Sequence, residues 1–146
     1  MRYVHTMVRI SDVDRALTFY CGVLGLEMIR QIESDQHRLT AVFLATPSDA
    51  PSARTRRAPE LELICYWNPD TLPPLTNGGH VAFAVKNLYT ASQELLDKGV
   101  TLIRPPSDGF TTFFKSPDGA TIQFLQEGEP LPVQEPWKSM PTVGTW

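Results

Sequence analysis

Four side chains that could hold a metal ion occur in two matching pairs along the chain. His5 and His80 each open a strand-like segment, and Glu62 and Gln123 each follow much later with a donor oxygen. Two imidazoles, a carboxylate and an amide oxygen are donors that a divalent cation such as Zn, Ni, Co, Mn or Fe accepts. A lone histidine on a strand is more often a hydrogen-bonded structural residue than a ligand. The pairing therefore favours one divalent metal ion per site, bound by His5, Glu62, His80 and Gln123.

An internal repeat relates the two pairs. Residues 5–30 and 80–104 both begin with histidine, continue into a helix-like run that ends at a glycine, and finish at an arginine. A shorter match places Glu62, in Glu-Leu-Glu-Leu-Ile, opposite Gln123, in Ala-Thr-Ile-Gln-Phe. Self-similarity at a fixed offset indicates two copies of one supersecondary unit.

Alternation of side chains predicts which face of each strand carries these donors. Apolar residues take every second position in segments 4–10, 60–67 and 80–85, which is the period of a half-buried strand. The apolar set faces a core. We therefore expect the histidines and Glu62 to point to the opposite, polar face.

Each histidine-bearing strand leads into a predicted helix. The first helix is capped by Ser11 or Asp12 and ends at Gly25, where a positive φ costs little. The second lies between Asn87 and Gly99. Further strands are predicted at residues 27–33, 38–45, 100–104, 110–115 and 120–126. The sequence thus predicts an α+β fold of two βαβββ modules, with curved mixed sheets, helices on the outside and a polar concave face.

The two copies span about residues 1–68 and 79–127 and are expected to form a single domain over residues 1–127. Between the copies, residues 68–79 are rich in proline and are predicted to be a linker. A chain of 146 residues is long enough to bury the core of one such domain.

Two segments have no counterpart in the repeat. Residues 46–59 are rich in Pro, Ser and Arg and lack periodicity, which predicts a loop. A functional lid and a plain hairpin loop are both compatible with the sequence of residues 46–59. Residues 128–146 contain four prolines but also Trp137 and Trp146, so we expect an arm that lies on a surface of the protein.

Composition narrows the classes of function. The net charge of −3, with 13 basic against 16 acidic residues, provides no electrostatic footprint for nucleic acid. The N-terminus has no apolar signal region and no run is long enough to span a bilayer, so no membrane association is expected. Cys21 and Cys65 lie in apolar segments without a CxxC pattern. Reduced thiols in a cytoplasmic protein are therefore expected, and a disulfide is the less favoured alternative.

Five short motifs together resemble one known family. They are His-Thr-x-x-Arg from His5, Phe-Tyr before a Leu-Gly-Leu helix end, Glu-Leu at Glu62, Gly-His-Val-Ala at His80, and Ser-Pro-Asp-Gly-x-x-Ile from Ser116. This set resembles glyoxalase I, the lactoylglutathione lyase branch of the vicinal oxygen chelate superfamily, over residues 1 to about 127. The resemblance implies one divalent metal per site. It also implies a homodimer in which His5 and Glu62 of one chain meet His80 and residue 123 of the other.

The resemblance implies a lyase or isomerase that acts on a hemithioacetal, such as the methylglyoxal–glutathione adduct, or on another α-hydroxycarbonyl compound. Glu62 would be the base, and the proton would move between neighbouring carbons through an enediolate held on the metal. Such an enzyme detoxifies methylglyoxal. Arg9 matches the family's arginine that helps hold the glutamyl carboxylate of glutathione, and Tyr66 stands where the family has an asparagine.

The chain departs from the family at Gln123, where glyoxalase I has a glutamate. An amide can ligate a metal through oxygen but cannot act as a base near neutral pH. Proton transfer would then fall to Glu62 alone. The loss of one anionic ligand predicts a lower metal affinity and stronger polarisation of a bound carbonyl oxygen. Whether the thiol is glutathione stays open, because residues 108–114 lack the basic side chains that some members place there.

Two other functions are compatible with the same scaffold. One is a different superfamily enzyme, an epimerase or an Fe(II) ring-cleaving dioxygenase, although Gln123 disfavours the dioxygenase because its iron takes a carboxylate there. The other is a protein that binds a drug or metabolite without chemistry, as bleomycin-resistance relatives do. Those relatives generally lack the ligands, whereas this chain keeps His5, Glu62 and His80. The enzyme is the preferred reading.

Overall fold

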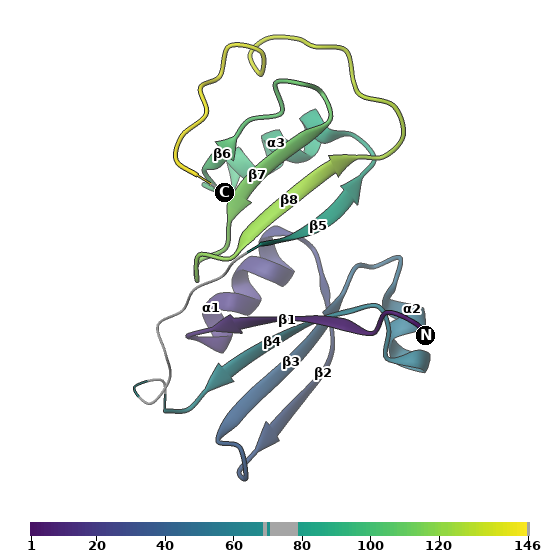
Figure 1. Cartoon of the computed structure of the whole chain (residues 1–146), viewed down its shortest axis with the longest axis vertical. Coiled ribbons are helices and arrows are strands. Elements are labelled where there is room, and N and C mark those ends of the chain that lie inside the picture. The colour runs from purple at the N-terminus through teal and green to yellow at the C-terminus, as the bar shows by residue number, and fades with distance from the viewer. Residues whose placement is uncertain (69, 71–78, 146) are drawn as a thin grey trace. The chain divides into compact units, whose positions relative to one another are not determined.

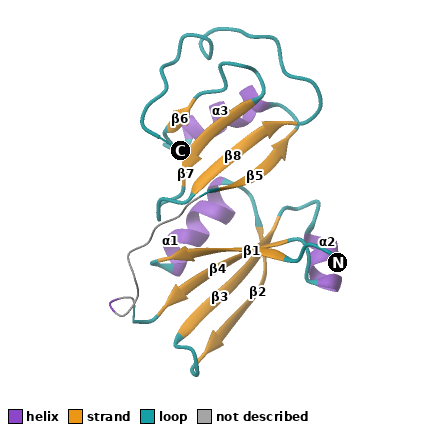
Figure 2. Cartoon of the chain, viewed as in Figure 1, coloured by secondary structure: helices purple, strands orange, loops and turns teal. Residues whose placement is uncertain are grey.

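A computed structural model of the chain describes residues 1–68, 70 and 79–145. These residues divide into two units, Met1–Thr76 and Asn77–Trp146, each built on a four-stranded sheet (Figures 1 and 2). Most of the predicted linker at residues 68–79 lies outside the described residues. Within the described part of the chain, no helix is long and apolar enough to cross a membrane.

The first unit combines strands with short helical segments. In chain order these are β1 (His5–Ile10), α1 (Val13–Leu17), the π-helical turn η1 (Thr18–Val23), β2 (Glu27–Ser34), β3 (Leu39–Ala45), α2 (Ala50–Arg56) and β4 (Glu60–Tyr66). The strand order in the sheet is β1-β4-β3-β2. Strand β1 pairs with β4 in parallel, and the other pairs are antiparallel.

The second unit repeats this topology. Its elements are β5 (His80–Val85), α3 (Leu88–Asp97), β6 (Leu102–Arg104), β7 (Thr111–Lys115) and β8 (Thr121–Gln126). The strand order is β5-β8-β7-β6, with β5 parallel to β8. The predicted fold class, two βαβββ modules with mixed sheets, is confirmed.

Both helices that follow the histidine-bearing strands begin with a side-chain cap, and Asp12 is one of the two residues predicted to cap the first. The Asp12 carboxylate accepts a hydrogen bond from the Arg15 backbone N–H at 2.7 Å, and the Asn87 amide oxygen accepts one from the Thr90 N–H at 3.0 Å. Such caps satisfy N–H groups that have no partner within the helix. After each helix the chain turns through a glycine with positive φ, +76° at Gly25 and +79° at Gly99.

The first helix is not the continuous α-helix that its apolar periodicity predicts. After Leu17 the backbone widens into the η1 turn, which shifts the side chains that follow. As a result, Phe19 is buried together with Tyr20. Phe19 lies outside the stripe that helical spacing predicts for this segment, which consists of Val13, Ala16, Leu17, Tyr20, Cys21 and Leu24. A π-turn inserts an extra residue into a helix, so a pattern based on 3.6 residues per turn loses its register there.

The prediction that residues 46–59 form a loop is wrong. Seven of them form α2, which begins after Asp49 and has a proline in its first turn. The helix buries Ala50 and Ala53 against Ala45 of β3. A short helix that packs through two alanines leaves no apolar stripe in the sequence, because alanine contributes little hydrophobic contrast.

The second unit has its core between α3 and one face of its sheet (Figure 1). Phe114 of β7, Ile122 of β8 and Leu88 of α3 are completely buried. Ile122 alternates with Gln123 along β8, so Gln123 lies on the other face of the sheet. In this unit the helix therefore covers one face, and the opposite face carries the residues of the candidate site.

The C-terminal arm packs on the second unit, as expected for the described part of residues 128–146. The Trp137 ring stacks on Tyr89 of α3, with ring centroids 5.8 Å apart and planes 2° apart. The Tyr89 hydroxyl donates to the Pro132 carbonyl at 2.9 Å. Further along, the Val143 N–H donates to the Ile103 carbonyl at 2.7 Å. Trp146 lies outside the described residues.

Candidate metal and substrate site

The first unit brings two of the predicted site residues into contact. Register places His5 beside Glu60 and Met7 beside Glu62 on parallel strands β1 and β4, so His5 and Glu62 are diagonal neighbours on one face. His5 Nε2 lies 3.1 Å from Glu62 Oε2, and their side chains are 40% and 15% exposed. An imidazole nitrogen and a carboxylate oxygen are thus already adjacent on a surface that solvent reaches.

The second unit repeats this register. His80 pairs with Thr121 and Ala82 pairs with Gln123 on the parallel strands β5 and β8. Gln123 therefore stands two positions beyond the partner of its histidine, as Glu62 does in the first unit. His80 is exposed and Gln123 is half-buried. The match between Glu62 and Gln123 that the repeat predicts is confirmed at the level of strand pairing.

A phenylalanine completes the pattern in each unit. Phe43 of β3 pairs with Glu62, and its ring meets the His5 ring edge-on at 6.1 Å and 77°. Phe113 of β7 pairs with Gln123, and its ring meets the His80 ring at 5.6 Å and 83°. Edge-to-face packing of this kind restrains the imidazole rings. We call His5, Glu62 and Phe43 the first half-site, and His80, Gln123 and Phe113 the second half-site.

The Gln123 amide is held in one orientation. Its Nε2 donates to Thr111 Oγ1 at 2.8 Å, so the carbonyl oxygen Oε1 is the atom that remains to receive a cation. Amide oxygen is a usable ligand for hard and borderline divalent metals, whereas amide nitrogen is not. The orientation found here therefore suits an oxygen ligand.

Each half-site supplies two donors. Among the residues that the structure describes, no group of three or more His, Cys, Asp or Glu side chains gathers in one place. Neither half-site alone supplies four donors, so a four-ligand metal centre would have to combine two half-sites. The combined donor set of two imidazoles, one carboxylate and one amide oxygen fits a borderline divalent cation.

An ion pair beside the first half-site was not predicted. The Arg30 guanidinium forms two hydrogen bonds with the Glu60 carboxylate, Nη1 to Oε1 and Nη2 to Oε2. It also lies 3.6 Å from the centroid of the Phe43 ring. The Glu60 side chain is completely buried. The repeat matches Arg30 to Arg104, but the partner of Arg30 depends on the register of three strands and on an irregularity between Met28 and Arg30.

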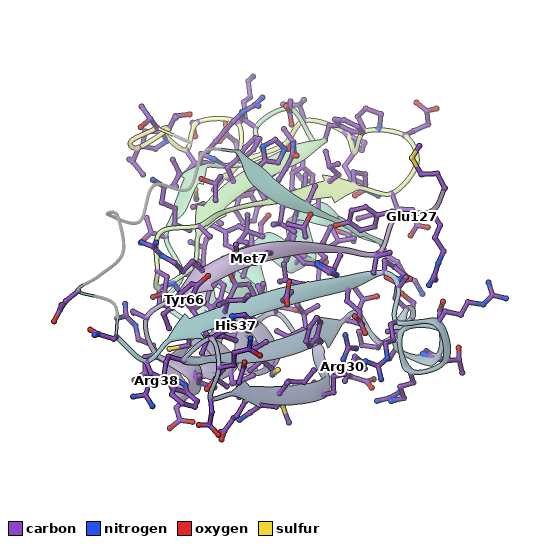
Figure 3. All side chains as sticks on the ribbon, turned by 60° about the horizontal axis from the view of Figure 1, so that its bottom comes forward. Met7, Arg30, His37, Arg38, Tyr66 and Glu127 are labelled. Carbon is purple, nitrogen blue, oxygen red and sulfur yellow. The ribbon has the colours of Figure 1, made fainter. Side chains whose placement is uncertain are left out.

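Arg9 and Tyr66, the predicted substrate contacts, lie further along the same face. Alternation places Arg9 on the His5 face of β1 and Tyr66 on the Glu62 face of β4, and both side chains are half-buried. Figure 3 shows Tyr66 and Arg30 toward opposite ends of this sheet, with Met7 on the edge strand β1. The face of the first unit thus has the buried ion pair at one end and the two candidate substrate contacts at the other.

The cysteines take no part in either half-site. Cys21 and Cys65 are free thiols, as expected, and both are half-buried. Burial raises the pKa of the Cys21 thiol, which lowers its thiolate fraction and its reactivity.

Comparison with known proteins places this geometry in context. The profile of the Glyoxalase/Bleomycin resistance protein/Dioxygenase superfamily matches residues 2–124. The chain is 32% identical over 132 residues to a probable lactoylglutathione lyase of Synechocystis sp., covering 86% of this chain and 95% of the relative. It is 33% identical over 131 residues to the lactoylglutathione lyase of Haemophilus influenzae, covering 86% and 93%.

A solved structure extends the comparison to three dimensions. The trypanothione-dependent glyoxalase I of Leishmania major superposes with a TM-score of 0.70 at 26% identity, covering 86% of each chain. The similarity therefore includes nearly all of both βαβββ modules.

Proposed function

The chain belongs to the Glyoxalase/Bleomycin resistance protein/Dioxygenase superfamily and is a lactoylglutathione lyase-like enzyme, and we propose that it isomerises hemithioacetals by proton transfer at Glu62. The substrate class is the adduct of a thiol with a 2-oxoaldehyde such as methylglyoxal. The contact between His5 and Glu62 on an accessible polar face carries this proposal, because it places a carboxylate where a substrate carbon could approach.

The reaction moves one hydrogen between adjacent carbons. The Glu62 carboxylate takes the proton from the carbon that carries the sulfur and the hydroxyl group. It then returns a proton to the neighbouring carbon, while the first carbon becomes the carbonyl of a thioester and the second becomes a secondary alcohol. No oxidant or second substrate is needed, because the product is an isomer of the hemithioacetal. A bound divalent cation would stabilise the negative charge that develops on the substrate oxygens.

The metal would be held by His5, Glu62, His80 and Gln123. The equal register of the two half-sites supports this assignment, since it gives each histidine one oxygen donor at the same offset. The amide of Gln123 cannot take a proton near neutral pH. Of the two oxygen donors, Glu62 is therefore the one that can act as a base, and His5 restrains it through their contact.

We further propose that the protein works as a homodimer in which each site combines the first half-site of one chain with the second half-site of its partner. Four ligands require two half-sites, and a two-fold dimer provides two combinations of a first half-site with a second. The free thiols support a reducing compartment, and we place the protein in the cytoplasm.

Arg9 and Tyr66 are the proposed contacts for the thiol portion of the substrate. Arg9 would hold a carboxylate by paired hydrogen bonds, and Tyr66 would add an aromatic surface and a hydroxyl. The related enzymes are named for glutathione in bacteria and described as trypanothione-dependent in Leishmania major. We therefore expect the contacts of Arg9 and Tyr66 to select the thiol that this chain uses.

The test is isomerisation of the methylglyoxal–glutathione hemithioacetal with Ni²⁺, Co²⁺, Mn²⁺ or Zn²⁺ added to metal-free protein. Glu62→Gln should lower kcat by about 10²- to 10⁴-fold, the usual contribution of a general base. Gln123→Glu should keep or raise activity, because it restores an anionic ligand and a second possible base. Glu33→Gln, an exposed carboxylate on β2, serves as the control and should behave as the natural protein does.

A Glu62→Gln variant with undiminished kcat would remove Glu62 as the base. If the natural protein turned over no hemithioacetal with any of the four metals, the proposed substrate class would be wrong.

A further inference from the structure

We propose that Thr111 is a positioning residue that orients the Gln123 amide, so that its oxygen rather than its NH₂ group faces the proposed metal site. The inference rests on the proposed function, because it concerns the same metal site. It goes beyond the proposed function because it concerns Thr111, the neighbour that decides which end of the Gln123 amide faces the metal.

The hydrogen bonds of Thr111 leave its hydroxyl one role toward Gln123. Thr111 is 6% exposed, and its Oγ1 donates to the Phe124 carbonyl at 3.3 Å. A hydroxyl has a single hydrogen, so with that hydrogen engaged Oγ1 can only accept from Gln123 Nε2, at 2.8 Å. The Thr111 N–H is itself bonded to Asp108 Oδ1 at 2.9 Å, which holds the start of β7 in place.

Orientation matters for an amide in a way that it does not for a carboxylate. The two ends of an amide differ, and only the oxygen binds a metal, whereas the two oxygens of a carboxylate are equivalent. Without a neighbour that accepts from Nε2, nothing at Thr111 would favour the amide orientation that turns the oxygen toward the metal. A carboxylate at position 123 would need no such partner, because either of its oxygens can bind.

The internal repeat supplies a built-in comparison. Phe113 pairs with Gln123 as Phe43 pairs with Glu62, so Thr111, two residues before Phe113, corresponds to Ala41. The half with the amide therefore has a buried hydroxyl beside it, and the half with the carboxylate has a buried methyl group. The Gln123 amide, which needs an acceptor for its NH₂ group, has the Thr111 hydroxyl beside it. The Glu62 carboxylate, which has no hydrogen to donate, has the Ala41 methyl group.

The experiment is a titration of metal-free protein with Co²⁺, followed by the visible d–d absorption of the bound ion. The variants are Thr111→Val, which keeps the shape but removes the acceptor, and Thr111→Ser, which keeps the hydroxyl. Thr112→Val is the matched control. Thr112 is also completely buried on β7, but its hydroxyl donates to the Arg104 carbonyl at 2.8 Å and does not touch Gln123.

We expect Thr111→Val to weaken Co²⁺ binding about tenfold and to change the d–d spectrum, the size of effect that loss of a ligand's orienting partner has in other metal sites. Thr111→Ser and Thr112→Val should bind Co²⁺ like the natural protein. In a Gln123→Glu background, Thr111→Val should have no such cost. In metal-free protein, NMR should show the Gln123 carboxamide protons protected from exchange, and Thr111→Val should abolish that protection.

The inference is overturned if Thr111→Val binds Co²⁺ as well as Thr112→Val does, or if its cost is the same with Glu at position 123. The first result would leave the proposed enzyme intact, since the natural protein would still bind the metal. A natural protein that acquired no Co²⁺ would overturn the metal assignment and this inference together, even if isomerase activity were found.

Discussion

Glu60 and Glu62 are two residues apart on one strand, yet their surroundings suit opposite tasks. Glu60 is completely buried and held by two hydrogen bonds from Arg30. Glu62 is partly exposed, and its Oε2 lies 3.1 Å from Nε2 of the His5 imidazole. A carboxylate whose charge is already neutralised is of little use to a substrate, whereas one beside an exposed histidine can exchange partners. The partner of each carboxylate therefore distinguishes the structural acid, Glu60, from the proposed base, Glu62.

The Arg30–Glu60 pair predicts a large and asymmetric effect on stability. Arg30→Met leaves a buried carboxylate without a partner, which costs about 3–5 kcal/mol of unfolding free energy. The double variant Arg30→Met with Glu60→Gln should be more stable than Arg30→Met alone, because no unpaired charge remains. Urea unfolding measures both. The control is Arg54→Met, which breaks the exposed Arg54–Glu27 pair and should cost about 0–1 kcal/mol. Equal losses for Arg30→Met and Arg54→Met would contradict the argument.

Residues that the repeat marks twice were predictable from the sequence, and residues defined by tertiary neighbours were not. His5, Glu62, His80 and Gln123 stand out because each has a counterpart in the other half. Their shared faces and equal registers follow from strand pairing, although their role as ligands stays a prediction. The repeat does not mark Thr111 or Glu60 in this way. Their importance depends on which strands are neighbours and on the direction of a hydroxyl hydrogen. The pattern of apolar residues along the chain predicts neither of these.

At the scale of elements, the arm and α3 form one packed unit through Tyr89. The ring of Tyr89 is covered by Trp137, and its hydroxyl donates to the Pro132 carbonyl. Burial, reinforced by the negative charge of Asp108, raises the pKa of Tyr89 above its usual value of 10.0, although a backbone hydrogen bond from Gln134 opposes this. The folded state therefore favours the neutral phenol.

This pKa shift predicts that the arm loosens in alkali. Because the pKa of Tyr89 is raised on folding, its contribution to stability is complete below pH 10 and is lost as the pH rises through the folded-state pKa. An ionised phenolate also cannot donate to Pro132. Tryptophan fluorescence during an alkaline titration should report the release of Trp137. Tyr89→Phe should lose about 1 kcal/mol at neutral pH and show a smaller alkaline change.

Tyr3→Phe is the control for that titration, since Tyr3 is exposed. If Tyr3→Phe and Tyr89→Phe altered the alkaline transition equally, Tyr89 would not be its source.

The helices show where local signals suffice and where they fail. Asp12, one of the two predicted caps, caps the first helix, because capping is a contact within one turn of the chain. The helix α2 escaped prediction since its buried residues are alanines, and η1 did so since a widened turn has no residue signature in Thr18–Val23. For the arm, the sequence predicted only that it lies on a surface of the protein, because Trp137 is too apolar to remain in water.

At the scale of the whole molecule, duplication separates the donors into two half-sites that are similar but not equal. One has a carboxylate and the other an amide, so a site that combines one of each has a single carboxylate ligand. In the proposed homodimer every site would need both halves. This arrangement makes the activity of mixed dimers predictable.

His5→Ala and His80→Ala should each be inactive alone but recover activity when the two chains are co-expressed. Random pairing makes about half of the dimers mixed, and each mixed dimer has one intact site of two, so about a quarter of the natural activity should return. His5→Ala with Glu62→Gln is the control, because both changes fall in the first half-site and no intact site can form. If the first pair recovered no activity, shared sites would be excluded.

The hydrogen bond from Val143 to Ile103 has a practical consequence for handling the protein. It occupies a backbone carbonyl of β6, the outermost strand of its sheet. A sheet border with bare amides and carbonyls invites other chains to add to it. Proteolytic trimming near Gly128 would expose that border and the apolar surface beneath Trp137 together. Preparations that have lost the tail should therefore aggregate, and intact mass is the first property to verify before any assay.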